Sequence, residues 1–224
     1  MTRRHGSLFV ILGVTACTPP APSGTPAPSP TPRAAADSAR PTATADTGVL
    51  AGLPPGRGTL RQEEISIRLD LTDVTAQLLP LDESVIRVLS PDSYRAIRAV
   101  IAAHDGDLGR LTRQYHLRER QLWRVSFIGL ANGARFTPRD LTLTQAGREF
   151  RPLDVVPLTR GFGSERLQAG QNEQGLYLFD DGLSLSQPLT ASMASVRSMQ
   201  WESILRVVER ERVLIRQRGG THQR

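Results

Sequence analysis

The feature that most constrains this chain is a stretch, residues 18–58, that is rich in proline, alanine, serine and threonine. It has no apolar periodicity, so it buries too little surface to offset the conformational entropy that folding costs. Proline-rich segments of this kind favour extended polyproline II. We predict a disordered linker here and a disordered tail over residues 219–224. Residues 59–218, about 160 in number, are enough for one domain with a hydrophobic core.

The first residues have the composition of an export signal. A basic start (residues 3–5) precedes the apolar run 8–16, and small residues precede Cys17, the only cysteine. This order is typical of a secretory signal peptide, which we predict over residues 1–16. The apolar run is too short to cross a bilayer, which takes about 20 residues.

The run from Val14 to Cys17, Val-Thr-Ala-Cys, resembles the lipobox of bacterial lipoproteins. In that family the cysteine thiol receives a diacylglycerol, the chain is cut before the cysteine, and the new amine is acylated. The resemblance implies a mature protein that starts at Cys17, is anchored to a membrane by lipid, and has residues 17–58 as its tether. Thr18 follows the cysteine where the family's retention rule has Asp. That difference favours the outer membrane, on its periplasmic face or at the surface.

The distribution of charge argues against a nucleic-acid partner. The whole chain has a formal net charge of +6 and contains no lysine. Residues 59–218 hold 22 arginines against 20 carboxylates, so the domain is nearly neutral and lacks the basic footprint that a phosphate backbone requires. Two basic stretches remain, at 110–124 and 206–218. We expect solvated helix faces there, and the alternative is contact with anionic lipid or an acidic polymer.

Alternating apolar residues predict several strands. Isoleucine and leucine occupy every second position from 65 to 71, which indicates a half-buried strand, and 85–89 is interpreted as a second strand. The alternation returns over 121–130, before the turn signal Asn132-Gly133. Further along the chain, two short runs flank Gln145-Ala-Gly147 as a hairpin, and a strand over 175–179 ends at the turn 180–182.

Three helices are expected beside these strands. Ser90 is a suitable N-cap, Pro91 suits the first helical position, and a second short helix is plausible from Leu108 to Leu117. The last predicted helix, residues 200–216, carries a stripe formed by Trp201, Ile204, Leu205, Val208 and Ile215. We interpret the stripe as packing on the sheet, with Glu211 and Arg212 interrupting it. The alternative is a partner-facing helix that presents Trp201, Ile204, Leu205 and Val208.

These elements predict a mainly β fold, an antiparallel immunoglobulin-like β-sandwich with one or two inserted short helices and a C-terminal helix. Four runs, at 136–141, 147–150, 167–170 and 175–179, resemble the immunoglobulin-like, telokin-like accessory domains of secreted bacterial lipoproteins. The resemblance covers about 60 residues and implies a fold. A fold alone does not assign an activity.

Only one cluster has the residue types of a catalytic or metal site. His104, Asp105 and Asp107 group an imidazole with two carboxylates, the chemistry that metal binding or acid–base catalysis needs. The same residue types form ordinary turns and caps, which is the interpretation we favour. Ser164 lacks the flanking pattern of a nucleophile elbow. We therefore expect no catalytic residue, no metal and no cofactor.

The sequence leaves three hypotheses for function. The first is a lipid-anchored, non-enzymatic binding or assembly module that contacts another envelope protein or the cell wall. The second is a small-molecule carrier with a cavity between the sheet and the helices. The third is a metal-dependent envelope hydrolase that uses the cluster from His104 to Asp107.

Overall fold

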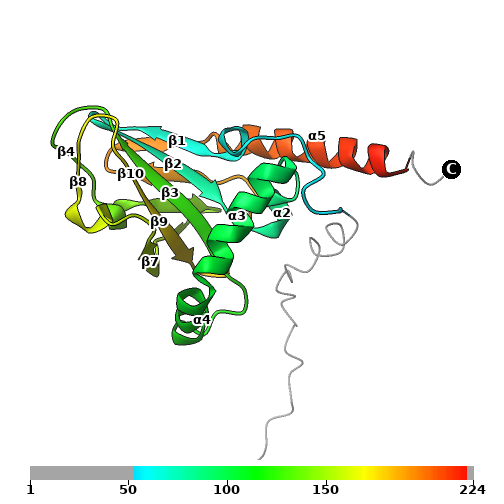
Figure 1. The fold of residues 1–224 in the computed structure, drawn as a ribbon, viewed down its shortest axis with the longest axis horizontal. Coiled ribbons are helices and arrows are strands. Elements are labelled where there is room, and N and C mark those ends of the chain that lie inside the picture. Colours follow the sequence, from blue (N-terminus) through cyan, green and yellow to red (C-terminus); the bar gives the residue numbers. More distant parts are fainter. Residues whose placement is uncertain (1–52, 221–224) are drawn as a thin grey trace, which may run out of the picture. The chain divides into compact units, whose positions relative to one another are not determined.

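A five-stranded antiparallel sheet forms the centre of the fold (Figure 1). The computed structural model describes residues 53–220, so the predicted signal peptide, Cys17 and most of the predicted linker lie outside the described residues. In sheet order, the strands are β1 (Ile67–Asp70), β2 (Val74–Pro80), β3 (Gln121–Gly129), β9 (Asn172–Phe179) and β7 (Asp154–Pro157).

The register of the sheet follows the alternation in the sequence. In the central strand β3, Val125 lies opposite Leu78 on one side and Gly175 on the other. Positions 123, 125 and 127 share one face and are fully buried. This confirms the prediction that these residues form the inner face of a strand, because side chains alternate between the two faces of a sheet.

A second antiparallel sheet has four strands, in the order β11 (Val196–Ser198), β10 (Thr190–Met193), β5 (Thr142–Gln145) and β6 (Arg148–Phe150). The turn between β5 and β6 confirms the predicted hairpin. Ala146 and Gly147 have φ values of 49° and 78°, the left-handed conformation that a two-residue type I′ turn requires at both positions. A small third sheet pairs β4 (Ala134–Arg135) with β8 (Arg166–Leu167).

Both larger sheets contribute to one hydrophobic core. The inner faces supply Trp123 and Phe127 from the five-stranded sheet, and Leu143 and Ala191 from the four-stranded sheet. This arrangement is compatible with a β-sandwich. It confirms a mainly β fold with antiparallel sheets and a C-terminal helix.

The remaining elements are short helices on the surface of the sheets. They are η1 (Gln62–Ile65), α2 (Glu83–Ile86), α3 (Pro91–Ala103), α4 (Asp105–Gln114), η2 (Pro138–Asp140) and η3 (Phe162–Ser164). As predicted, α3 begins at Pro91 and buries Ile97, although the side chain of Ser90 makes no capping hydrogen bond. The second helix, α4, starts at Asp105 instead of Leu108.

The prediction of a second strand over 85–89 is wrong. Residues 83–86 form α2, whose N-cap Asp82 accepts a hydrogen bond from the backbone N–H of Ser84 at 2.7 Å. In so short an apolar run, periodicity does not distinguish a strand from a helix. The aspartate N-cap that precedes the run favours the helix. The true second strand is β2, which the sequence analysis missed.

The C-terminal helix α5 (Trp201–Gly220) packs on the domain along one side. Trp201 is fully buried, its indole ring centre lies 5.8 Å from that of Trp123, and its N–H donates to the carbonyl of Leu185 at 3.2 Å. Ile204 and Val208 are buried and Leu205 is half-buried against the core. These four residues therefore pack inside their own domain, which corrects the alternative of a partner-facing stripe.

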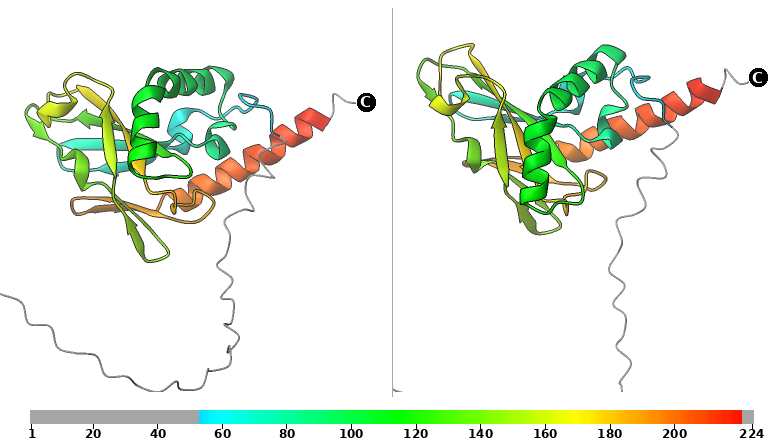
Figure 2. Two further views of the ribbon diagram at one scale, coloured as in Figure 1. Left: turned by 90° about the horizontal axis from the view of Figure 1, so that it is seen from below. Right: turned by 60° about the horizontal axis from the view of Figure 1, so that its bottom comes forward.

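The two ends of the domain differ in what they contain. Figures 1 and 2 show the turns around β4 and β8 at one end and the C-terminal half of α5 at the other. Leu53, within the predicted linker, is buried and packs in the core, so the packed chain starts before residue 59. No helix among residues 53–220 is long and apolar enough to span a bilayer.

Candidate functional site

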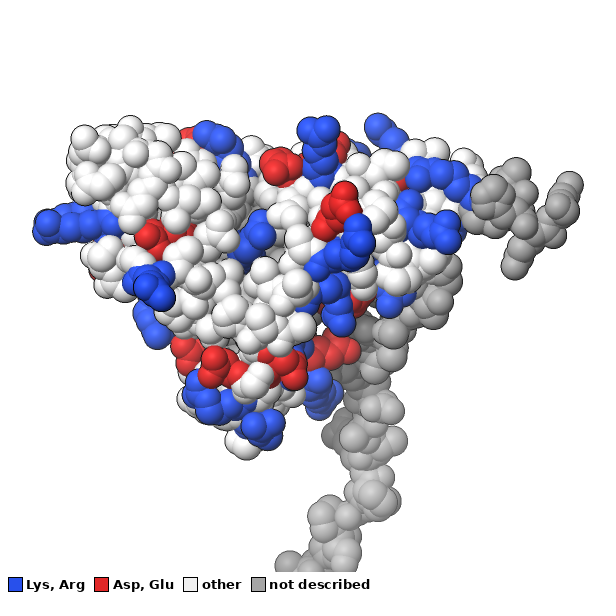
Figure 3. All heavy atoms as spheres, in the orientation of Figure 1, with Lys and Arg blue, Asp and Glu red and all other residues white. Residues whose placement is uncertain are grey.

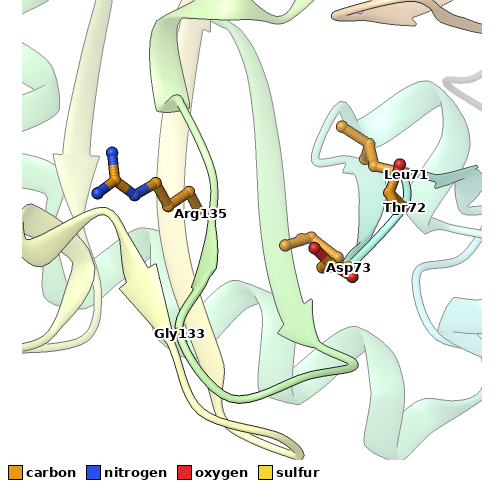
Figure 4. Close-up of a pocket in the computed structure, with 6 residues that line it drawn as sticks. Leu71, Thr72, Asp73, Gly133 and Arg135 are labelled. Carbon is orange, nitrogen blue, oxygen red and sulfur yellow. The ribbon is translucent and has the colours of Figure 1, made fainter.

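An open hollow of ≈ 380 Å³ lies between two turns at the end of the domain opposite the last turns of α5 (Figure 4). We call it the turn hollow. Its lining comes from the β1–β2 turn and from the turn that leads into β4, and consists of Leu71, Thr72, Asp73, Val74, Gly133 and Arg135. It is the candidate binding site of the domain.

The β1–β2 turn forms one wall of the hollow. The backbone N–H of Leu71 donates to the carbonyl of Val74 at 2.9 Å, which leaves Thr72 and Asp73 as the two residues at the tip. Both tip residues are exposed, while Val74 is buried and continues into β2. A tight two-residue connection holds such a tip in place because the strands on either side are already paired.

The second wall depends on two glycines. Gly133 has φ +74°, a conformation that suits glycine, and this explains the predicted Asn132-Gly133 turn. A Cβ atom on Gly129 would lie 2.3 Å from the carbonyl oxygen of Gln168, so only glycine permits this close approach. The Asn132 side-chain oxygen accepts from the N–H of Ala169 at 3.1 Å and ties the turn to the neighbouring loop.

A cluster of buried aromatic rings supports this wall from inside. The ring centres of Phe127 and Phe136 lie 4.5 Å apart, and those of Phe136 and Phe162 lie 5.8 Å apart. Phe136 directly follows β4, so its burial fixes the strand that carries Arg135. Aromatic pairs at these distances add to the stability that burial provides.

The surface around the hollow is amphipathic. Leu130 is 54% exposed, and its backbone N–H donates to the carbonyl of Asp73 at 2.8 Å, which places it beside the hollow. Figure 4 shows the guanidinium of Arg135 pointing away from Asp73, so the two charges stay available to a ligand. None of the six lining residues is a Ser, Cys or His. The single carboxylate of Asp73 has no imidazole or thiol beside it in the lining, and this composition suits binding.

A second, smaller hollow of ≈ 230 Å³ lies where the β5–β6 turn meets the start of α5. Met199, which is 75% exposed, and Glu202 line it together with Ala146 and Gly147. Glu202 forms an ion pair with Arg206 at 2.8 Å. With one flexible side chain and one paired carboxylate, this hollow is a weaker candidate than the turn hollow.

The structure separates the three residues of the predicted metal or acid–base cluster. The Nδ1 atom of His104 lies 3.0 Å from the carbonyl of Val100, Asp105 pairs with Arg120 at 2.6 Å, and Asp107 pairs with Arg110 at 3.2 Å. Each side chain thus interacts with a different neighbour at the junction of α3 and α4. Within residues 53–220, no three His, Cys, Asp or Glu side chains are placed to hold a metal ion.

Ser164 serves the loop around η3. Its hydroxyl donates to the carbonyl of Gly161 at 2.7 Å and also lies 3.1 Å from the carbonyl of Arg166. The hydroxyl therefore stabilises a turn, consistent with the expectation that Ser164 is not a nucleophile. The lipidation residue Cys17 lies outside the described residues.

Three buried charged residues escaped the sequence analysis. Glu173 is buried and accepts hydrogen bonds from the side chains of Thr159 and Gln171, the second at 2.7 Å. Glu211 and Arg212 are buried on the inner side of α5 and extend the stripe that they were expected to interrupt. Their helical spacing places Glu211 and Arg212 on the same side of α5 as Val208 and Ile215, and this could have indicated that they are buried. Charged residues usually mark the exposed face of a helix, so the sequence alone favoured exposure.

Burial perturbs the pKa of two side chains on the central strands of the sheet, Tyr177 and Arg124. Burial raises the pKa of the Tyr177 phenol well above its usual range, and the buried hydroxyl has no hydrogen-bond partner among the described residues. Burial also lowers the pKa of the Arg124 guanidinium, which donates to the side-chain oxygen of Gln62 at 2.6 Å. Neither group lines the turn hollow, so neither supplies chemistry there.

The turn hollow therefore combines half-buried Leu71, one carboxylate and one guanidinium on a rigid support, with exposed Leu130 beside it. Two turns form the hollow, and from the sequence only the one at Asn132-Gly133 was predicted. The chain matches no protein-family model, no curated protein and no solved structure.

Proposed function

We propose that this chain is an exported lipoprotein, anchored to the cell envelope through lipid on Cys17, whose domain is a non-enzymatic binding module for another envelope protein. The observation that carries the binding role is the turn hollow with Leu130 exposed at its edge. The turns that form it belong to the end of the domain opposite the last turns of α5 (Figure 2). A surface that faces away from the attachment point is accessible to a partner.

Two further observations support a binding module. The hydrolase alternative needs His104, Asp105 and Asp107 at one point, and each has a separate partner.

In Figure 3, charged side chains are sparse over the turn end, at the upper left of the view. Protein interfaces are depleted in charged residues at their centres, so this composition favours a protein partner over the cell wall.

The immunoglobulin-like resemblance belongs to the same proposal. The hairpin of β5 and β6 and the strand β9 occur where the resemblance places its hairpin and closing strand. Immunoglobulin-like accessory domains use loops at the ends of the sandwich to bind, and the turn hollow is formed by such loops.

The binding role is tested by site-specific photo-crosslinking in living cells. A photoreactive amino acid replaces Leu130 in the full chain, and the matched control carries it in place of Arg95, which is exposed on α3. We expect one dominant protein adduct from position 130 and none from position 95. Equal adducts at both positions, or none at 130, would contradict the proposal.

The anchor is tested separately in the same cells. Cys17→Ala should move the protein from the membrane fraction to the soluble fraction and abolish incorporation of labelled fatty acid. Unchanged fractionation and labelling would rule out the lipid anchor without affecting the binding site.

A further inference from the structure

Between residues 206 and 216, α5 exposes an arginine-rich face that contains two apolar side chains. We call it the arginine face and define it as Arg206, Arg210, Val213 and Leu214, with exposed Arg216 at its border. We propose that the arginine face binds the surface of a membrane that contains anionic lipid. The proposal extends the proposed function, because it states which side of an anchored domain contacts the membrane.

Helical spacing separates the arginine face from the core. The buried residues of α5 are Trp201, Ile204, Val208, Glu211, Arg212 and Ile215. At 3.6 residues per turn, these positions fall on one side of the helix. Residues 206, 210, 213 and 214 fall on the opposite side and are exposed. The domain therefore leaves this face of its longest helix uncovered.

The charge of the face is positive. Arg206 pairs with Glu202 at 2.8 Å, whereas Arg210 and Arg216 form no ion pair with any residue in the described range 53–220. The nearby carboxylates have other partners, since Glu209 pairs with Arg212 and Glu211 is buried. In Figure 3, arginine side chains gather over α5 at the right of the view. Each such cation near an anionic bilayer adds about 1 kcal/mol of attraction.

The apolar residues of the face point to a lipid surface as the anionic ligand. Val213 is 47% exposed and Leu214 is 40% exposed, between arginines on the same helix. Helices that lie in a membrane interface combine apolar side chains with Arg, whose stems reach the headgroup layer. Arginines near the C-terminus of a helix also interact favourably with the helix dipole. That interaction does not explain why Val213 and Leu214 are exposed between them.

The chain enters the domain against the C-terminal half of α5, on the side of Glu211 and Arg218. The guanidinium of Arg218 donates to the carbonyl of Arg57 at 3.3 Å, and the N–H of Thr59 donates to Glu211 at 3.0 Å. From Cys17 to Leu53 the chain advances 36 residues, which reach at most about 120 Å. A lipid on Cys17 would therefore hold this end of the domain within reach of the bilayer.

The test measures binding of the full chain to vesicles by flotation, with Cys17→Ala in every sample so that no lipid anchor contributes. The vesicles contain either phosphatidylcholine alone or phosphatidylcholine with phosphatidylglycerol. Because all variants share the same first 52 residues, differences between them report on α5. We expect Arg210→Glu with Arg216→Glu to lower the partition onto anionic vesicles roughly tenfold or more, with no change on neutral vesicles.

The matched control reverses the same number of charges elsewhere. Arg113 lies at the end of α4 and Arg151 lies in a loop, both exposed and without an ion pair among the described residues. Arg113→Glu with Arg151→Glu should leave anionic binding within about twofold, which would attribute the loss to the arginine face rather than to net charge. Val213→Ser with Leu214→Ser should weaken binding at high salt, where electrostatic attraction is screened.

Several outcomes would overturn the proposal. Equal losses in the two charge-reversed pairs would show attraction by net charge alone. A dimer that forms with rising concentration and is abolished by Val213→Ser with Leu214→Ser, without vesicle binding, would assign the face to a second copy. Circular dichroism of each variant establishes that the helix is intact. Fractionation of Cys17→Ala in cells tests the anchor independently.

Discussion

The turn end and the helix end of the domain are stabilised in different ways. At the turn end, Phe127, Phe136 and Phe162 pack together, and the buried carboxylate of Glu173, opposite Phe127 in the sheet, accepts from the uncharged side chains of Thr159 and Gln171. At the helix end, the buried carboxylate of Glu211 accepts from Thr59 and Arg218, and buried Arg212 donates to the carbonyl of Ser84. The turn end thus combines aromatic packing with one carboxylate held by neutral donors, and the helix end buries groups of both charges.

The difference has consequences for function. Apolar support leaves the turn end rigid and sparsely charged, which suits a protein partner. At the helix end, buried charge orients α5 and leaves its arginines on the outside. A domain that contacts a membrane with one end and a partner with the other needs this asymmetry, because each contact uses a different chemistry.

The largest expected effects come from removing one aromatic side chain at each end. Phe136→Ala and Trp201→Ala should each lower the free energy of unfolding by about 3–5 kcal/mol, because each leaves a cavity in the core. Urea denaturation followed by tryptophan fluorescence measures Phe136→Ala, and circular dichroism measures Trp201→Ala. A loss under 1 kcal/mol in either variant would mean that this end does not depend on packing.

Glu211→Ala tests how much the buried carboxylate at the helix end stabilises the domain. We expect a loss of about 2 kcal/mol in the free energy of unfolding, since hydrogen bonds to a charged group are removed from a buried site. The control is Glu202→Ala, which breaks an exposed pair with Arg206 and should cost less than about 0.5 kcal/mol. Equal losses in the two variants would show that burial of Glu211 contributes nothing.

Tyr177→Phe tests the buried, unpaired phenol in β9. The buried hydroxyl has no hydrogen-bond partner among residues 53–220, so its removal should change the free energy of unfolding at pH 7 by less than about 1 kcal/mol, toward greater stability. Burial raises the pKa of this phenol above that of the unfolded chain, about 10, so its ionisation costs the fold nothing below pH 10 and destabilises the fold as pH rises further.

Thermal unfolding from pH 7 to 11 measures the alkaline effect. The Tyr177→Phe variant should lose less stability above pH 10 than the natural chain. Tyr115→Phe is the comparison. Burial also raises the pKa of that phenol, but its hydroxyl donates to the carbonyl of Leu153 at 3.0 Å, so its removal should lower stability at pH 7. Identical pH profiles for Tyr177→Phe and the natural chain would contradict the buried, unpaired hydroxyl.

The smallest effect is expected on the outside of the helix end. Arg210→Gln should change the free energy of unfolding by less than about 0.5 kcal/mol, because the side chain is exposed and has no ion pair within residues 53–220. Thermal unfolding measures it. A larger loss would mean that the arginine face stabilises the domain, and its role in binding would need a variant that preserves stability.

Local patterns account for much of the fold that was predicted. Period-two alternation identified β3 and β9, paired turn residues identified the β5–β6 hairpin, and Pro91 marked the start of α3. These features depend on residues close together in sequence. The run 85–89 was misassigned because a short apolar run fits either a strand or a helix. β2 was missed because it is buried on both faces and shows no alternation.

The candidate site was less predictable. Asn132-Gly133 identified one turn of the turn hollow, but nothing in the sequence placed it beside the β1–β2 turn, about 60 residues away. That proximity depends on the pairing of β2 with β3. The exposed position of Leu130 likewise results from the end of β3 and from its hydrogen bond to Asp73.

The sequence by itself determined the mainly β character of the domain and the presence of a C-terminal helix, because composition and periodicity are local properties. Only the tertiary structure decided which side of α5 is buried, where the carboxylate of Glu211 finds its partners, and how two distant turns enclose a hollow. The reason is physical. Burial and hydrogen bonding between distant segments depend on the strand register and helix packing of the whole domain.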